Sequence, residues 1–201
     1  MKESFTLDTK IAVKKHKHAN KEADERLFWK NGFGFNSLED IPVKVEHMKL
    51  SGTDITAVEL SYLAERIKTI GMLDLNHTNF GNEGIRALLK LESVRELRLK
   101  ENEGIDNDCM EDIGQMPDLE FLHLRGTAVN VDGLTKITSL KKLSTVLVSD
   151  DREEEWIRKA MAPIVAALPD CSFSVNNIQF YPREPWEKIL AEQQQGHSEN
   201  L

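Results

Sequence analysis

Long apolar runs are missing from this chain of 201 residues. None approaches the roughly 18 apolar residues that a membrane-spanning helix needs. The N-terminal stretch, Met1 to Asp8, contains no apolar signal-peptide core. We therefore expect no membrane insertion and a cytoplasmic location, although a leader removed earlier would leave no trace in the sequence.

Cysteine is scarce, and positive charge is in the minority. The two cysteines, Cys109 and Cys171, form no Cys-x-x-Cys pair, so no disulfide framework is indicated. We interpret both as small buried apolar side chains. The formal net charge of −8 argues against general affinity for nucleic acids or anionic membranes.

Recognisable catalytic motifs are also missing. The chain has no Gly-x-Ser-x-Gly, no Walker loop and no His-Glu-x-x-His. His16 and His18, in a short basic run, are two residues apart and so do not share a helix face. We predict no catalytic residue, no metal and no cofactor, and an enzyme is the remote alternative.

What the chain does contain is one phrase repeated four times. It occupies Val45–Thr53, Ile70–Thr78, Val94–Asn102 and Leu119–Thr127. The last leucines of the phrases stand at 50, 75, 99 and 124, so the steps are 25, 24 and 25 residues. A period of this length predicts a solenoid, in which neighbouring units stack to bury their apolar sides.

Each repeat predicts a short strand followed by a short helix. The two leucine-type residues of a phrase are two apart and therefore face the same side of a strand. Apolar residues spaced by three or four then follow, as a helix packed on the strand requires. In the four repeats they are Ile55, Leu60, Leu63 and Ile67; Phe80, Ile85, Leu88 and Leu91; Ile105, Met110, Ile113 and Met116; Val129, Leu134, Ile137 and Leu140.

This phrase resembles the leucine-rich repeat family, L-x-x-L-x-L-x-x-[N/C/T]. Threonine at 53, 78 and 127 resembles bacterial repeats, while Asn82–Ile85 and Val131–Leu134 resemble the helix starts of ribonuclease-inhibitor-like and cysteine-containing-like repeats. The resemblance implies an α/β fold, a right-handed β-α solenoid or horseshoe that binds proteins on its concave sheet. We expect a short parallel sheet of about five to six strands, capped at both ends.

The ends of the chain depart from the repeat. We predict an N-terminal helical and aromatic cap over 1–44, repeats over 45–148, an atypical C-terminal repeat or cap over 149–181, and a partly disordered tail over 182–201. In the first segment a helix is expected from Asn20 to Phe28, ended by Asn31–Gly34. Its aromatic residues are interpreted as a cap, with a peptide-docking site as the alternative. A fifth strand is expected within Leu140–Val148, with Thr145 in place of the second leucine.

Strand alternation then predicts which side chains line the concave face. They are the neighbours of the inward leucines: His47, Lys49 and Ser51; Met72, Asp74 and Asn76; Glu96, Arg98 and Lys100; Phe121, His123 and Arg125; and, from the fifth strand, Lys142 and Ser144. Five are Lys or Arg and two are acidic, a formal sum of +3 on a chain of −8. Arginine around an aromatic residue favours a binding hot spot, and the charge favours an acidic partner.

Two interpretations of this face remain open. In the first, it binds a protein partner, and reversing the charges of Arg98 and Arg125 abolishes binding with little loss of thermal stability. In the second, its charges only maintain solubility, with Arg98 paired to Asp74 across strands. For the whole protein we predict a non-enzymatic protein-binding module, which is expected to be a monomer. The alternative is a structural or assembly subunit held permanently in a larger complex. Such a subunit should expose a large apolar patch.

Overall fold

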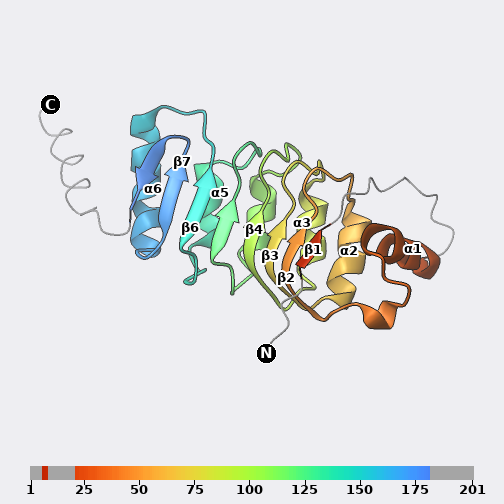
Figure 1. Ribbon diagram of the computed structural model, residues 1–201. Helices are drawn as coiled ribbons and strands as arrows, with labels where there is room; N and C mark the ends of the chain where they lie inside the picture. The colour runs from red at the N-terminus through yellow and green to blue at the C-terminus, as the bar shows by residue number, and fades with distance from the viewer. Residues whose placement is uncertain (1–5, 9–20, 182–201) are drawn as a thin grey trace, which may run out of the picture.

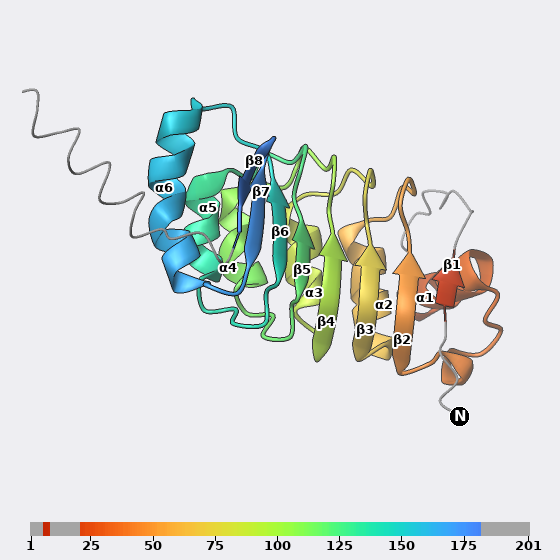
Figure 2. The same ribbon diagram turned by 60° about the vertical axis from the view of Figure 1, so that its left-hand side comes forward.

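The computed structural model describes residues 6–8 and 21–181. Within these ranges eight strands form one open sheet, in which they lie side by side in chain order (Figures 1 and 2). The strands are β1 (Thr6–Asp8), β2 (Lys44–Lys49), β3 (Thr69–Asp74), β4 (Ser93–Arg98), β5 (Phe121–His123), β6 (Thr145–Val148), β7 (Ser172–Val175) and β8 (Ile178–Phe180). The pairs from β1 to β7 are parallel, and β8 is antiparallel to β7. The expected α/β solenoid is therefore confirmed.

Helices cover one face of the sheet and leave the other face open (Figure 2). They are α1 (Lys21–Phe33), α2 (Ala57–Arg66), α3 (Asn82–Leu88), α4 (Met110–Ile113), α5 (Val131–Leu134) and α6 (Glu154–Ala167), with 3₁₀ turns at Leu38–Asp40, Asn107–Cys109 and Thr135–Ile137. Side-chain caps determine where some of these helices begin. Thr56 and Glu59 form a capping box at the N-terminus of α2, and Asn130 caps the N-terminus of α5. None of the described helices has the length and apolar character needed to cross a lipid bilayer.

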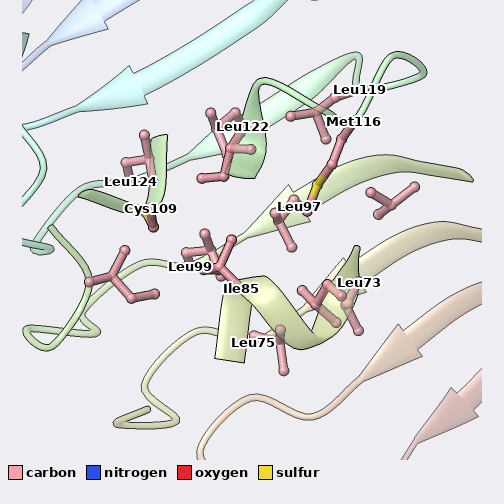
Figure 3. Close-up of a cluster of buried hydrophobic side chains, with 14 of the residues drawn as sticks. Leu73, Leu75, Ile85, Leu97, Leu99, Cys109, Met116, Leu119, Leu122 and Leu124 are labelled. Carbon is pink, nitrogen blue, oxygen red and sulfur yellow. The ribbon is translucent and has the colours of Figure 1, made fainter. Parts of the chain in front are cut away.

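The inward positions of successive strands are in register. Met48 pairs with Leu73, Leu73 with Leu97 and Leu97 with Leu122. These side chains and the later apolar residues of each repeat form one core, part of which is shown in Figure 3. Leu91 packs against this core and is only partly buried. The leucine spacing thus predicted the core correctly.

The fifth repeat is shifted relative to the prediction. Val146 pairs with Leu122 on one side and with Phe173 on the other, so Val146 and Val148, rather than Leu143 and Thr145, hold the two inward leucine positions. Val148 follows Leu124 by 24 residues, within the range of the earlier steps. The prediction was wrong because valine fills both inward positions, and a search for leucine aligned the phrase from Leu140 instead of Leu143.

The sheet extends further than the repeats indicate. β2 to β7 are the five to six parallel strands expected from the phrases, and β1 and β8 add one strand at each edge. Neither added strand contains the repeated phrase, and β8 is held both by its pairing with β7 and by the buried side chain of Phe180.

The aromatic residues near the N-terminus belong to the core. Phe28 and Trp29 are buried, Phe33 and Phe35 pack against the core, and Leu27 is exposed. These aromatic residues are therefore not an exposed docking site. A half-buried ion pair also joins α1 to α2, since the guanidinium group of Arg66 donates to the buried Glu25 at 2.6 Å.

Helix α1 ends later than predicted. It continues through Asn31 and Gly32 to Phe33, and Gly34, at φ +78°, ends it in the left-handed conformation. One glycine inside a helix costs about 1 kcal/mol, and burial of the adjacent aromatic side chains outweighs that cost. The predicted C-terminal tail and the basic run around His16 lie outside the described residues, and the domain boundaries stay predictions.

A buried asparagine links two repeats at the ends of their strands. The side-chain oxygen of Asn102 accepts hydrogen bonds from the backbone N–H groups of Thr78 and Asn79 and from the Thr78 hydroxyl. Its amide group donates to the carbonyls of Leu75 and Leu99. The shorter side chain of threonine at the same place in other phrases does not bridge two repeats in this way. The hydroxyls of Thr53 and Thr127 donate to a carbonyl of their own repeat.

Candidate functional site

The face of the sheet turned away from the helices, the concave face, carries its side chains in rows. Parallel strands in register place equivalent residues side by side. The first row is His47, Met72, Glu96, Phe121 and Thr145, and the second row is Lys49, Asp74, Arg98, His123 and Leu147. Ser51, Asn76, Lys100 and Arg125 follow two residues further on and form a third row. The structure thus brings together every predicted residue of this face except Lys142 and Ser144.

Lys142 lies outside these rows. β6 begins at Thr145, so Lys142 is in the preceding loop, where its ammonium group contacts Asp118 at 2.6 Å. Thr145 and Leu147 occupy the places that Lys142 and Ser144 were expected to fill. This correction follows from the shifted fifth repeat, and it lowers the formal charge of the rows to +2.

Phe121 lies at the centre of the face between two nitrogen-bearing side chains. The guanidinium carbon of Arg98 is 5.4 Å from the centre of the Phe121 ring, and the His123 ring meets Phe121 edge-on at 6.3 Å. Arg98 also donates to Glu96 at 3.0 Å. This central cluster of Glu96, Arg98, Phe121 and His123 combines an aromatic surface with charges of both signs, as binding hot spots often do.

Most charges on the face have a local partner. Lys100 contacts Glu101 at 3.0 Å, and the Asp74 carboxylate accepts from the backbone N–H of Asn76. The predicted pairing of Arg98 with Asp74 was wrong, because Glu96 lies on the same strand and the same face as Arg98. Met72 is buried and offers little surface for contact. The face is consequently a mixed-charge surface with a small positive excess.

Arg125 holds the C-terminal strands together. One terminal nitrogen of its guanidinium group donates to the Ser174 hydroxyl at 2.6 Å and to the Asn176 carbonyl at 2.7 Å. The Gln179 amide donates to the same hydroxyl. Arg125 thus reaches across β6 to residues about 50 positions later in the chain, a distance of two repeats. Ser174, Asn176 and Gln179 were not among the predicted site residues. The spacing of two repeats between Arg125 and Ser174 could have placed these two on the same face.

The pKa of His123 is held below its ordinary value. Burial is the main cause, followed by the positive charges of Arg125, Lys100 and Arg98, and Asp74 opposes them weakly. His123 is therefore neutral at pH 7. Protonation of this half-buried imidazole would place a fourth positive charge beside the three cations.

This pKa predicts a loss of stability in mild acid. The unfolded chain binds a proton at His123 more readily than the folded chain does. The stability associated with neutral His123 is therefore fully present above the unfolded pKa of about 6.5, and it is lost as the pH falls through the lower pKa of the folded state. Urea denaturation at several pH values should show this decline beginning as the pH falls below about 6.5. His123→Gln should flatten it, and an equally steep decline in that variant would contradict the assignment.

Other reactive groups are occupied or inert. Burial raises the pKa of the Cys109 and Cys171 thiols to about 12, consistent with small buried apolar side chains. An open hollow of about 730 Å³ lies beside the loops after β4, β5 and β6. Its buried carboxylate, Asp150, already accepts from Arg152 and from the Val131 N–H. The described residues contain no group of three potential metal ligands.

The repeated phrase, the strand in each repeat and the parallel sheet define a β-α solenoid of the kind that leucine-rich repeat proteins form. Comparison with protein-family models found no match, and comparison with curated proteins found none. Among solved structures the chain is similar to the leucine-rich repeat-containing protein LegL7 from Legionella pneumophila, with 14% identity and a TM-score of 0.37. The match covers 80% of this chain and 66% of LegL7, so the chain spans just under two thirds of that protein's length.

Proposed function

We propose that this protein is a non-enzymatic protein-interaction module and that it binds a partner of acidic character on the concave face. The observation that carries this proposal is the central cluster around Phe121. An arginine over a half-buried aromatic ring in the middle of an open face supplies the residue types that dominate binding energy. The fold also supports binding on this face, because the open side of the sheet offers a broad surface for a partner.

The exposed apolar residues favour this function over a permanent assembly subunit. Among the described residues the large exposed apolar side chains are Leu27, Val43, Val58, Trp156 and Tyr181. They come from five separate segments: α1, the turn before β2, α2, α6 and the end of β8. A permanent subunit is expected to gather such residues in one large patch.

The proposal predicts that Phe121→Ala weakens partner binding strongly. Removing a central aromatic anchor costs about 2 kcal/mol or more, roughly a 30-fold loss of affinity. The partner would first be captured on the immobilised full chain from lysate of the source cells and identified, and the purified partner would then be titrated by calorimetry against wild type and variant.

Lys142→Ala is the matched control, because Lys142 is exposed but lies outside the rows. It should bind the partner as wild type does. If Phe121→Ala binds as tightly as the control, the concave face is not the binding surface. Arg125 is a poor choice for this test, since its bonds to Ser174 and Asn176 mean that charge reversal there should also lower stability.

A further inference from the structure

Resting on the proposed function, we propose that Arg98, His123 and Arg125 form a subsite for one carboxylate side chain of an acidic peptide segment, and that His123 takes up a proton when this carboxylate binds. The inference adds the recognised chemical group and a dependence on pH to the binding surface described above.

The three side chains are neighbours on one face. Arg98 on β4 pairs directly with His123 on β5, and Arg125 follows His123 by two residues along the same chain direction. Residues opposite each other on neighbouring strands are about 5 Å apart, and residues two apart along a strand are about 7 Å apart. The three side chains therefore start close enough to contact the same carboxylate.

Each of the three carries a nitrogen without a partner. The Nε atoms of Arg98 and Arg125 and the Nε2 atom of His123 are shielded from solvent and make no hydrogen bond to any described residue. A carboxylate on the face would reach them through a small turn of these side chains. Buried polar groups are usually paired, and three such nitrogens gathered on two neighbouring strands are uncommon. A carboxylate accepts several hydrogen bonds at once, and its bonds to charged donors are the strong ones.

The existing contacts hold both arginines in place. Arg98 is anchored by Glu96 and by the Phe121 ring, and Arg125 by Ser174 and the Asn176 carbonyl. In both residues a single terminal nitrogen makes these hydrogen bonds, so the other N–H groups of each guanidinium take no part in them. A subsite whose arginines are already fixed loses less entropy when an anion arrives.

Neighbouring charges restrict the positive region to the size of one anion. Asp74 on β3, Glu96 on β4 and Glu101 just after β4 surround the subsite. The neighbouring β6 and β7 contribute the neutral Thr145, Leu147 and Ser174. A continuous polyanion would meet these carboxylates and a chain of net charge −8. A spaced acidic side chain of a peptide would not, and this favours a protein segment over nucleic acid.

Proton uptake follows from the same surroundings. In the free protein burial and the cations Arg125, Lys100 and Arg98 favour neutral His123, while Asp74 and Glu96 are the nearby opposing charges. A bound carboxylate adds a negative charge beside the ring and so favours the imidazolium form. Since the complex then binds more protons than the free protein, affinity should rise as pH falls.

The test uses N-acetylated, C-amidated triglutamate as the probe, with triglutamine as its uncharged counterpart. Binding to the full chain would be followed by NMR of the arginine Nε–H and histidine ring signals at constant ionic strength. Triglutamate should shift the signals of Arg98 and Arg125, raise the His123 pKa, and bind about tenfold more tightly at about pH 5.5 than at pH 8.

Variants of opposite expected effect sharpen this test. Arg98→Gln should weaken triglutamate binding about tenfold, whereas Glu96→Gln, which removes the competing carboxylate, should strengthen it. His123→Gln should remove the pH dependence, and Lys142→Gln, which loses one cation outside the rows, should bind as wild type does.

Three results would overturn the subsite: a response to triglutamate no larger than that to triglutamine, a wild-type affinity independent of pH, or tighter binding of a short DNA duplex or of inorganic phosphate than of triglutamate. These results would leave the proposed function standing if the captured partner still depends on Phe121. Conversely, a partner insensitive to Phe121→Ala would remove the proposed function, whatever triglutamate does.

Discussion

Replacing Asn102 by alanine is expected to destabilise the protein by about 4 kcal/mol or more, because each buried polar group left unpaired costs about 1–3 kcal/mol. Asn102 is fully buried and makes five hydrogen bonds, to Leu75, Thr78, Asn79 and Leu99. Alanine would leave two backbone N–H groups and two carbonyls without these bonds at the junction of two repeats. Urea denaturation followed by far-ultraviolet circular dichroism would measure the loss.

Thr127→Ala is the matched control at the same position of the next repeat. The Thr127 hydroxyl donates to the Leu124 carbonyl and accepts from the Val129 N–H, without crossing to another repeat. Its removal should cost about 1 kcal/mol. Equal losses in the two variants would show that Asn102 does not link the repeats in the way its bonds indicate.

The second large effect is expected at Trp29. Its side chain is fully buried, and its ring lies 5.2 Å from the rings of Phe28 and Phe33 and 6.1 Å from that of Phe35. Trp29→Ala should cost about 3–5 kcal/mol through lost burial and the cavity left behind. The measurement is the change in urea midpoint at constant slope.

Leu27 offers a control on the same helix. It is 41% exposed, two residues before Trp29, and Leu27→Ala should change stability by no more than about 0.5 kcal/mol. A Trp29→Ala variant that unfolds at the same urea concentration as Leu27→Ala would show that α1 is not part of the cooperative core.

The inward positions of the sheet could be predicted from spacing because burial leaves few choices there. Leu73, Leu97 and Leu122 repeat at a nearly constant step, and a side chain two residues away must face the same side of the strand. The concave-face residues of the first four repeats could be predicted in the same way, because side chains alternate between the two faces of a strand. In the fifth repeat valine replaced leucine at an equivalent inward position, and the resulting shift placed Lys142 on the wrong element.

The remaining features depend on side-chain geometry, which spacing does not determine. Alternation places Arg98 and Arg125 on the concave face, but it does not show that Arg98 selects Glu96 over Asp74. Nor does it show that Arg125 reaches two repeats further to Ser174. Strands β1 and β8 could not be predicted because each is only three residues long and lacks the repeated phrase.

The reversed direction of β8 limits how this molecule can assemble. A row of unpaired backbone groups at a sheet edge is a template for adding further copies, and proteins avoid this with short or redirected edge strands. Here β8 occupies the free edge of β7 and β1 that of β2, and each is three residues long. Because β8 runs against the other strands, the series of parallel pairs ends at that edge, and a second copy adding there would have to pair with a reversed strand of three residues.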